Sequence, residues 1–273
     1  MLELIKAVLF GIVEGITEWL PISSTGHMIL LNEFVTLNVS EKFWETFLVV
    51  IQLGAILAVV LLFWKKIFPF DFGGGAVIRK DIWKLWAKII VACIPAAAVG
   101  ILFDDFLDKY LYNYTVVSLA LIIFGIAFLL IEEKNKGKIA RINSLEEITW
   151  NTAFIIGLFQ LIAAIFPGTS RSGATIVGAL LIGVSRTVAA EFTFFLAIPV
   201  MLGASLLKIL KFGLAFSASE AMILLTGMAV AFLVSIVVIR FLMDYIKKHD
   251  FKVFGWYRIV LGILVLAYFG LFV

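Results

Sequence analysis

Charged residues are scarce in this sequence. Asp, Glu, Lys and Arg make up only 15% of its 273 residues, against about 25% in a typical soluble domain. Cysteine occurs once, which excludes an intramolecular disulfide framework. The 21 glycines and five prolines are far fewer than a collagen-like or low-complexity chain contains.

Apolar side chains make up 63% of the residues, too many for a soluble globule of this length to cover with polar groups. A bilayer core about 30 Å thick requires about 20 apolar residues in helical form. The chain is therefore predicted to be an all-α integral membrane protein whose function depends on polar residues inside the bilayer. Six segments meet the length requirement and are predicted to span: 43–64, 86–103, 114–132, 187–207, 220–240 and 253–273.

Two further hydrophobic segments, 4–36 and 148–185, are interrupted by Pro, Gly, Ser and Thr. The interruptions lie at 20–27 and 166–173. At 33 and 38 residues, both segments are long for one span. Each suits two short half-helices, and we expect a re-entrant hairpin that enters and leaves the membrane on the same side.

The net charge of +3 is too small to suggest a nucleic-acid partner, but the positive charges are unevenly distributed. Fifteen Lys and Arg fall in or beside the loops 65–88, 133–149, 186 and 240–252, and only five fall in the loops on the other side. This asymmetry exists only if both broken segments are re-entrant. Because Lys and Arg favour the cytoplasmic side, we expect both termini outside the cell. The run Gly73-Gly74-Gly75 is expected to be a flexible cytoplasmic loop.

The two broken segments resemble each other. Each has a Gly, a Glu or Gln three residues later, and a Pro ten residues after the Gly. These residues are Gly11, Glu14 and Pro21 in the first segment and Gly157, Gln160 and Pro167 in the second. The second segment has one residue inserted before its final Gly. Each segment is followed by three spans, an odd number, so the second copy would be inverted. The predicted fold is an inverted-topology repeat with halves 1–145 and 146–273, and such repeats build polar sites near the midplane.

Each interruption has a Pro, then Ser, Thr and Gly, then a new apolar run, a pattern that predicts a helix N-terminus with a hydroxyl cap. Unpaired N–H groups and the positive end of the helix dipole suit an anion there. Arg171 adds a planar set of donors suited to phosphate, although a structural ion pair with Glu14 or Glu18 is the alternative. The candidate phosphate-binding residues from this pattern are Ser23, Thr25, Gly26, Arg171 and Gly173.

Glu14 and Glu18 lie four residues apart, on one face of the first half-helix. Two carboxylates at this depth would repel each other unless a proton or a divalent cation lay between them. They suit a metal pair or a general base, and a helix end frayed into the interface is the alternative. His27 could act as nucleophile, base or acid, or simply bond to a backbone carbonyl. For Glu45, Glu191 and Arg258, we expect span-end positions or structural pairing.

Three motifs, at 14–27, 51–54 and 167–175, resemble those of the bacterial undecaprenyl-diphosphatase family, the bacitracin-resistance proteins. The resemblance runs along the whole chain. It implies hydrolysis of undecaprenyl diphosphate to undecaprenyl phosphate in the bacterial plasma membrane, with a divalent cation, Mg²⁺ or Ca²⁺, and a site open to the outer face. Matching residues are Glu14 and Glu18 in the acidic motif, Ser24 and His27 in a Ser/His pair, and Ser170, Arg171, Ser172 and Thr175 in a second phosphate motif.

Together these patterns suggest one mechanism. A cation held by Glu14 and Glu18 would bridge the diphosphate, and Ser24 would attack the terminal phosphorus with help from His27 or a Glu. Direct attack by water, with His27 as base or acid, is the competing mechanism. A polyprenyl-phosphate flippase or transporter is the main rival function. A channel is disfavoured because the polarity is concentrated at the two interruptions, and the sequence leaves a homodimer open.

Overall fold

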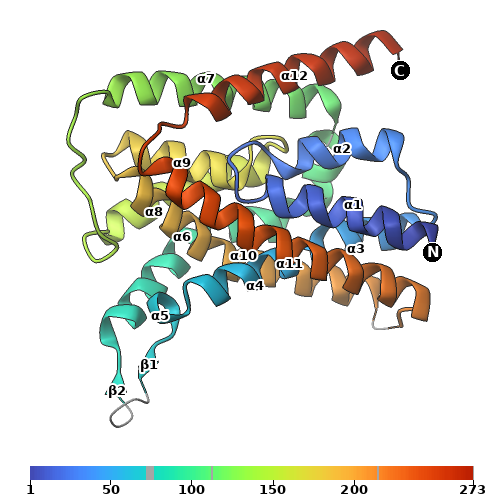
Figure 1. Cartoon of the computed structure of the whole chain (residues 1–273), viewed down its shortest axis with the longest axis horizontal. Coiled ribbons are helices and arrows are strands. Elements are labelled where there is room, and N and C mark those ends of the chain that lie inside the picture. The colour runs from blue at the N-terminus through green and yellow to red at the C-terminus, as the bar shows by residue number, and fades with distance from the viewer. Residues whose placement is uncertain (72–76, 112, 214, 273) are drawn as a thin grey trace.

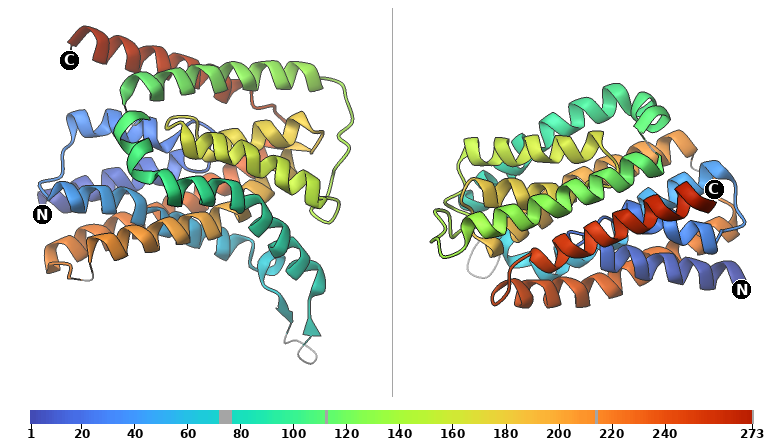
Figure 2. Two further views of the ribbon diagram at one scale, coloured as in Figure 1. Left: turned by 180° about the vertical axis from the view of Figure 1, so that it is seen from behind. Right: turned by 90° about the horizontal axis from the view of Figure 1, so that it is seen from above.

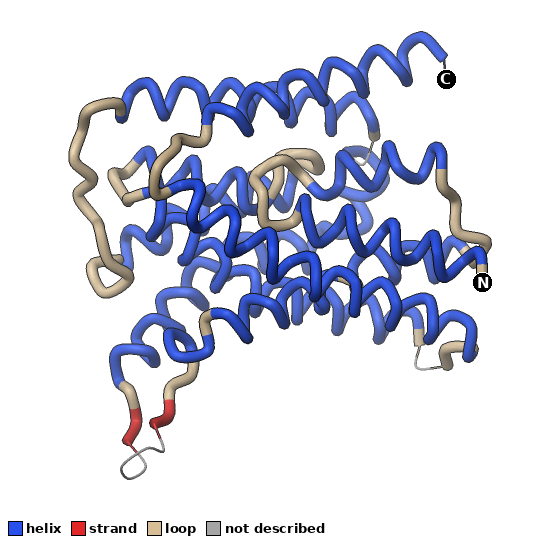
Figure 3. The backbone as a smooth tube through the Cα atoms, viewed as in Figure 1, coloured by secondary structure: helices blue, strands red, loops and turns tan. Residues whose placement is uncertain are grey.

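A computed structural model describes residues 1–71, 77–111, 113–213 and 215–272, and it is almost entirely helical (Figures 1 and 3). The Gly73-Gly74-Gly75 run lies outside the described residues. The elements, in chain order, are α1 (Leu2–Thr17), α2 (Ser24–Phe34), α3 (Glu41–Val50), α4 (Gln52–Leu62), α5 (Trp64–Ile67), β1 (Phe70–Asp71), β2 (Val77–Ile78), α6 (Lys80–Leu111), α7 (Tyr114–Asn135), α8 (Trp150–Ile165), α9 (Arg171–Leu181), α10 (Arg186–Phe212), α11 (Ala218–Ile246) and α12 (Lys252–Phe272).

Within the described residues, six helical segments are long and apolar enough to cross a membrane, and they coincide with the six predicted spans. They are Glu41–Leu62, Lys80–Gly100, Tyr114–Asn135, Arg186–Phe212, Ala218–Ile246 and Lys252–Leu271. The first comprises α3 and α4. The short antiparallel pair of β1 and β2, which the sequence analysis did not predict, pairs Phe70 with Ile78 and Asp71 with Val77.

Each interrupted segment folds as two short helices joined by a turn. In Figure 1, α1 runs from the N-terminus to the middle of the molecule, and α2 returns toward the same end. The pair α8 and α9 does the same from the opposite end, as the rear view in Figure 2 also shows. Both chain termini lie at the end where α1 begins.

Close backbone contacts hold the short helices against the long ones: α1 packs mainly on α11, and α8 mainly on α6. A Cβ added at Gly11 would lie 2.6 Å from the carbonyl oxygen of Gly227, and one added at Gly157 would lie 2.5 Å from that of Ala92. Small residues allow helices in membranes to approach this closely. Gly11 and Gly157, which align in the sequence, therefore play the same role: each allows a short helix to lie directly against the backbone of a long one.

Ion pairs fasten the end of the molecule away from the termini. The buried carboxylate of Glu132 accepts hydrogen bonds from the Arg186 guanidinium and from the main-chain N–H of Phe251. Glu191, also buried, binds Lys66 with an N–O distance of 2.7 Å. The structural pairing expected for Glu191 is therefore present.

We predict that Gly157→Ala lowers the stability of the folded protein, because the new methyl group would overlap the backbone of α6. Overpacking of this kind costs about 1–3 kcal/mol. Thermal unfolding in detergent measures the effect. Gly203→Ala on α10 is the matched control, since a Cβ there meets nothing within 4 Å. An unchanged unfolding temperature for Gly157→Ala would contradict the packing described above.

Candidate functional site

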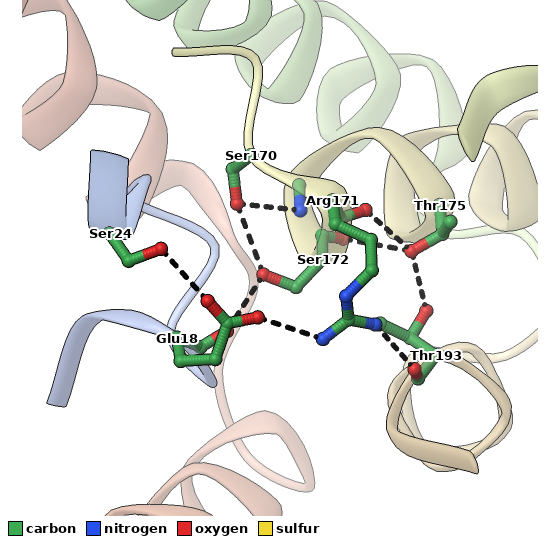
Figure 4. Close-up of polar contacts among 8 residues, drawn as sticks. Glu18, Ser24, Ser170, Arg171, Ser172, Thr175 and Thr193 are labelled. Atoms are coloured by element: carbon green, nitrogen blue, oxygen red, sulfur yellow. Dashed lines mark hydrogen bonds and ion pairs between the residues drawn. The ribbon is translucent and has the colours of Figure 1, made fainter. Parts of the chain in front are cut away.

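The turns that interrupt the two broken segments meet in the interior (Figure 4). A guanidinium nitrogen of Arg171 lies 3.0 Å from one carboxylate oxygen of Glu18. The Ser172 hydroxyl donates to the main-chain carbonyl of Glu18 over 3.2 Å. Residues from the two halves of the sequence therefore form one polar cluster.

The helices that follow the turns begin in the same way. Ser23 and Ser170 have φ angles of 76° and 68°, and they are the only non-glycine residues with positive φ among those described. Each hydroxyl accepts a hydrogen bond from an N–H three residues later, that of Gly26 or Gly173. The predicted hydroxyl caps are confirmed, and the strained backbone at both caps is of a kind that clusters at functional sites.

This shared geometry locates the extra residue of the second segment. Ser23 and Ser170 are equivalent caps, and each is followed three residues later by the glycine whose N–H it binds. The extra residue of the second segment therefore lies between Pro167 and Ser170. This agrees with the expectation that the extra residue precedes the final glycine, and the capping bond fixes its place because the Ser-to-Gly spacing is three residues in both segments.

Glu18 joins the two candidate motifs through its two carboxylate oxygens (Figure 4). One accepts a hydrogen bond of 2.8 Å from the Ser24 hydroxyl, and the other pairs with Arg171. Arg171 also donates to the main-chain oxygen of Thr193 over 2.7 Å. The ion pair with Glu18 that was considered as the alternative for Arg171 is thus present. The Nε atom of Arg171 is nevertheless buried and has no hydrogen-bond partner in the described part of the chain.

Glu14 lies one helical turn before Glu18 and is 1% exposed. Its Oε1 is buried without a hydrogen-bond partner among the described residues. The frayed-end alternative is wrong for Glu14, because α1 continues to Thr17. The described residues contain no group of three or more His, Cys, Asp or Glu side chains placed to hold a metal ion. Two carboxylates nevertheless fit Mg²⁺, which proteins bind through one or two carboxylates together with phosphate oxygens.

His27 is held at both ring nitrogens. Nδ1 lies 2.7 Å from the main-chain oxygen of Ser23, and Nε2 lies 2.7 Å from the hydroxyl of Tyr257 on α12. The carbonyl contact that was considered as a structural alternative is therefore present. The Ser24 hydroxyl donates to Glu18, not to His27.

The remaining candidates lie beside this cluster. The hydroxyls of Ser170 and Ser172 are 3.1 Å apart. Thr175 is fully buried and its hydroxyl bonds to that of Thr193, so it fastens α9 to α10. Thr25 is half-buried in the first turn of α2.

Arg258, on α12, was expected at a span end or in structural pairing. It is fully buried, so the span-end alternative is wrong. Its pairing is with main-chain oxygens and not with a carboxylate of the described structure. A signal was available, since Arg171 and Arg258 are the only Lys or Arg of the 22 that lie away from the loops and span ends. Its guanidinium donates to five main-chain oxygens, those of Pro21, Gly168, Thr169, Ala120 and Leu121.

Six apolar spans around a buried cluster of arginine, carboxylate and hydroxyl groups define a polytopic membrane protein with an interior polar site. Residues 7–264 match the family described as bacitracin resistance protein BacA, and the chain belongs to this family. The resemblance seen in the motifs is confirmed.

Three curated relatives illustrate how extensive the similarity is. The undecaprenyl-diphosphatase of Desulfitobacterium hafniense is 66% identical over 270 residues, covering 99% of this chain and 97% of the relative. Undecaprenyl-diphosphatase 1 of Clostridium acetobutylicum is 67% identical over 268 residues, covering 98% of each chain. The undecaprenyl-diphosphatase of Enterococcus faecalis is 62% identical over 267 residues, covering 97% and 96%.

We predict that Arg258→Met destabilises the protein, because it leaves buried carbonyl groups of both turns without donors. Each buried group left unsatisfied costs about 1–3 kcal/mol. Arg240→Met, at an exposed position of α11, is the control and should stay within about 0.5 kcal/mol of wild type. Thermal unfolding in detergent compares them. If Arg258→Met lowered the unfolding temperature no more than Arg240→Met does, Arg258 would not be holding the turns together.

Proposed function

We propose that the chain is an integral membrane phosphatase that hydrolyses undecaprenyl diphosphate to undecaprenyl phosphate and inorganic phosphate. Its family and the names of its relatives support this activity. The observation that carries the proposal is the Glu18 carboxylate, which binds the Ser24 hydroxyl with one oxygen and Arg171 with the other. In the bacterial plasma membrane, the reaction would recycle the lipid carrier of cell-wall synthesis and confer bacitracin resistance.

The fold is proposed to be an inverted repeat, with halves 1–145 and 146–273 that each contain a re-entrant hairpin and three spans. Reciprocal packing supports it: the first hairpin helix of each half, α1 or α8, lies on the second span of the other half, α11 or α6. The matching serine caps support it too. Turns at this depth are tolerated in a membrane only where protein buries them, as it does here.

The proposed orientation has both termini and the opening of the site outside the cell. Both termini lie at one end of the molecule. The Lys- and Arg-rich loops between α4 and α6, between α7 and α8, and between α11 and α12 lie at the other end (Figure 1). The preference of such loops for the cytoplasm supports this orientation.

Ser24 is proposed to attack the terminal phosphorus of the lipid diphosphate. Its hydroxyl already donates to Glu18, so Glu18 is better placed than His27 to take the proton. A bond forms between Ser24 Oγ and phosphorus, and the bond from phosphorus to the oxygen of undecaprenyl phosphate breaks. Water then releases inorganic phosphate from the serine. Direct attack by water, with His27 handling the proton, is the competing mechanism.

The diphosphate is proposed to bind between the N-termini of α2 and α9. Helix N-termini attract anions through unpaired N–H groups and the helix dipole. Arg171 supplies the positive charge, and its Nε has no partner in the described structure and is available to a phosphate oxygen. The surrounding contacts would come from Ser23, Thr25, Gly26, Ser170, Ser172, Gly173 and Thr175.

Glu14 and Glu18 are proposed to hold a divalent cation, Mg²⁺ or Ca²⁺. Arg171 forms its ion pair with Glu18, and the buried Glu14 carboxylate has no ion pair of its own among the described residues. Oxygen ligands of this kind suit both ions. When bound, such a cation neutralises charge on the diphosphate and on the leaving phosphate.

The rival function is a flippase or transporter, because broken helices in inverted repeats are also transporter anatomy. Phosphate release by purified protein in detergent, without any gradient, distinguishes the two. A carrier would release none.

We predict that Ser24→Ala and Arg171→Ala each reduce phosphate release from undecaprenyl diphosphate at least about 100-fold, because they remove the attacking hydroxyl and the main positive charge of the site. Ser144→Ala, in the loop before α8, and Arg240→Ala are the matched controls and should retain activity. Near-normal turnover by Ser24→Ala would rule out the serine nucleophile and leave direct attack by water.

We also predict that a chelator abolishes phosphate release and that added Mg²⁺ or Ca²⁺ restores it. Glu14→Gln should raise the metal concentration for half-maximal activity at least about 10-fold, since it removes a charged ligand. Calorimetric titration of metal into the protein measures binding directly. Glu33→Gln, at an exposed position of α2, is the control. Unaltered metal dependence in Glu14→Gln would exclude Glu14 as a ligand.

A further inference from the structure

Tyr257 brings a hydroxyl group from α12 to the ring of His27, 2.7 Å from Nε2. We propose that Tyr257 is a positioning residue for His27: it fixes the imidazole plane and the direction of Nε2, and a proton reaches Nε2 through its hydroxyl, which gives its own hydrogen to Nε2 and takes one from water in the site. The inference rests on the proposed function and concerns attack by water, in which His27 handles the proton, since the Ser24 hydroxyl donates to Glu18. Tyr257 lies outside the three sequence motifs.

The contacts of His27 decide which ring nitrogen carries the proton. Nδ1 faces the main-chain oxygen of Ser23 at 2.7 Å, and a carbonyl oxygen can only accept a hydrogen bond. Nδ1 therefore carries the hydrogen, and in the neutral ring Nε2 has the free lone pair. The Tyr257 hydroxyl donates to that lone pair. Nε2 is consequently the only ring atom that can take up a proton.

A tyrosine hydroxyl suits this position because it both donates and accepts. It donates to Nε2 when the imidazole is neutral, and it accepts from Nε2–H when the ring is protonated. The ring can thus keep its orientation through a cycle of proton uptake and release. The two rings are also stacked, with centroids 5.6 Å apart and planes 3° from parallel.

The adjacent residue on α12 keeps Tyr257 in register with the site. Arg258 donates to the carbonyl of Pro21, two residues before the strained cap Ser23 that binds His27 Nδ1. Both contacts of the imidazole, one through Ser23 and one through Tyr257, are therefore fixed to the same turn. Small movements of α12 relative to α2 are restricted where they would change the direction of Nε2.

A purely structural hydroxyl at this position would contribute little. Tyr257 is 45% exposed, so removing its hydroxyl opens no buried cavity. Tyr257→Phe keeps the stacked ring and removes only the hydrogen bond. The variant should therefore fold with the stability of wild type, which separates a positioning role from a structural one.

The kinetic test compares Tyr257→Phe with wild type in phosphate release from undecaprenyl diphosphate. We expect kcat to fall at least about 10-fold while KM changes less than about twofold, because the phosphate-binding groups are untouched. The matched control is Tyr245→Phe. Tyr245 stacks on His249 with centroids 4.5 Å apart at the opposite end of the molecule, so its loss should change nothing.

Two further measurements connect the effect to His27. In a His27→Gln background, Tyr257→Phe should cause no further loss, since residues that act through one another are not additive. Nitrogen NMR of labelled histidine should show the Nδ1-protonated tautomer of His27 in both proteins, because Ser23 fixes it, and an Nε2 signal that shifts when Tyr257→Phe removes its hydrogen bond.

An unchanged kcat, an equal loss in the His27→Gln background, or an unchanged Nε2 signal would each overturn the proposal. Failure of wild type itself to release phosphate would overturn the proposed function instead. In that case the Nε2 signal, which requires no turnover, still decides whether Tyr257 positions the ring.

Discussion

The buried guanidinium of Arg258 is the interaction on which the polar interior depends. An unpaired charge inside an apolar protein is costly, and here five main-chain carbonyls share it. These oxygens come from both turns and from α7. A turn in a membrane interior also needs donors for its free carbonyls. One side chain meets both requirements, and it thereby fixes the distance between two segments nearly 150 residues apart.

The charged groups of the site form a hydrogen-bond network in which some buried polar atoms have no partner among the described residues. Glu18 is satisfied by Ser24 and Arg171, whereas Glu14 Oε1 and Arg171 Nε are buried without partners among the described residues. Buried polar groups are normally hydrogen-bonded, so such exceptions need an explanation. A cation beside Glu14 and a phosphate beside Arg171 would satisfy both, which is why the proposed chemistry fits the arrangement.

Much of this structure could be predicted from local patterns in the sequence. The six spans follow from hydrophobic length, and they are confirmed because a long apolar helix satisfies its own backbone wherever it lies. The capping serines follow from Pro and Ser before an apolar run, since the cap bond closes within three residues. The motifs that contain Glu14, Ser24 and Arg171 also indicated the family.

Contacts between distant segments were decided only by the tertiary structure. The sequence left Ser24 with either His27 or a glutamate as partner, and only the meeting of the two turns brings Ser24 to Glu18 and Glu18 to Arg171. Nothing in local spacing placed Arg258 beneath both turns or Tyr257 against His27, because α12 lies more than 200 residues from the first turn. Apolar length and capping are properties of neighbouring residues, whereas the sharing of a buried charge or a proton depends on which helices pack together.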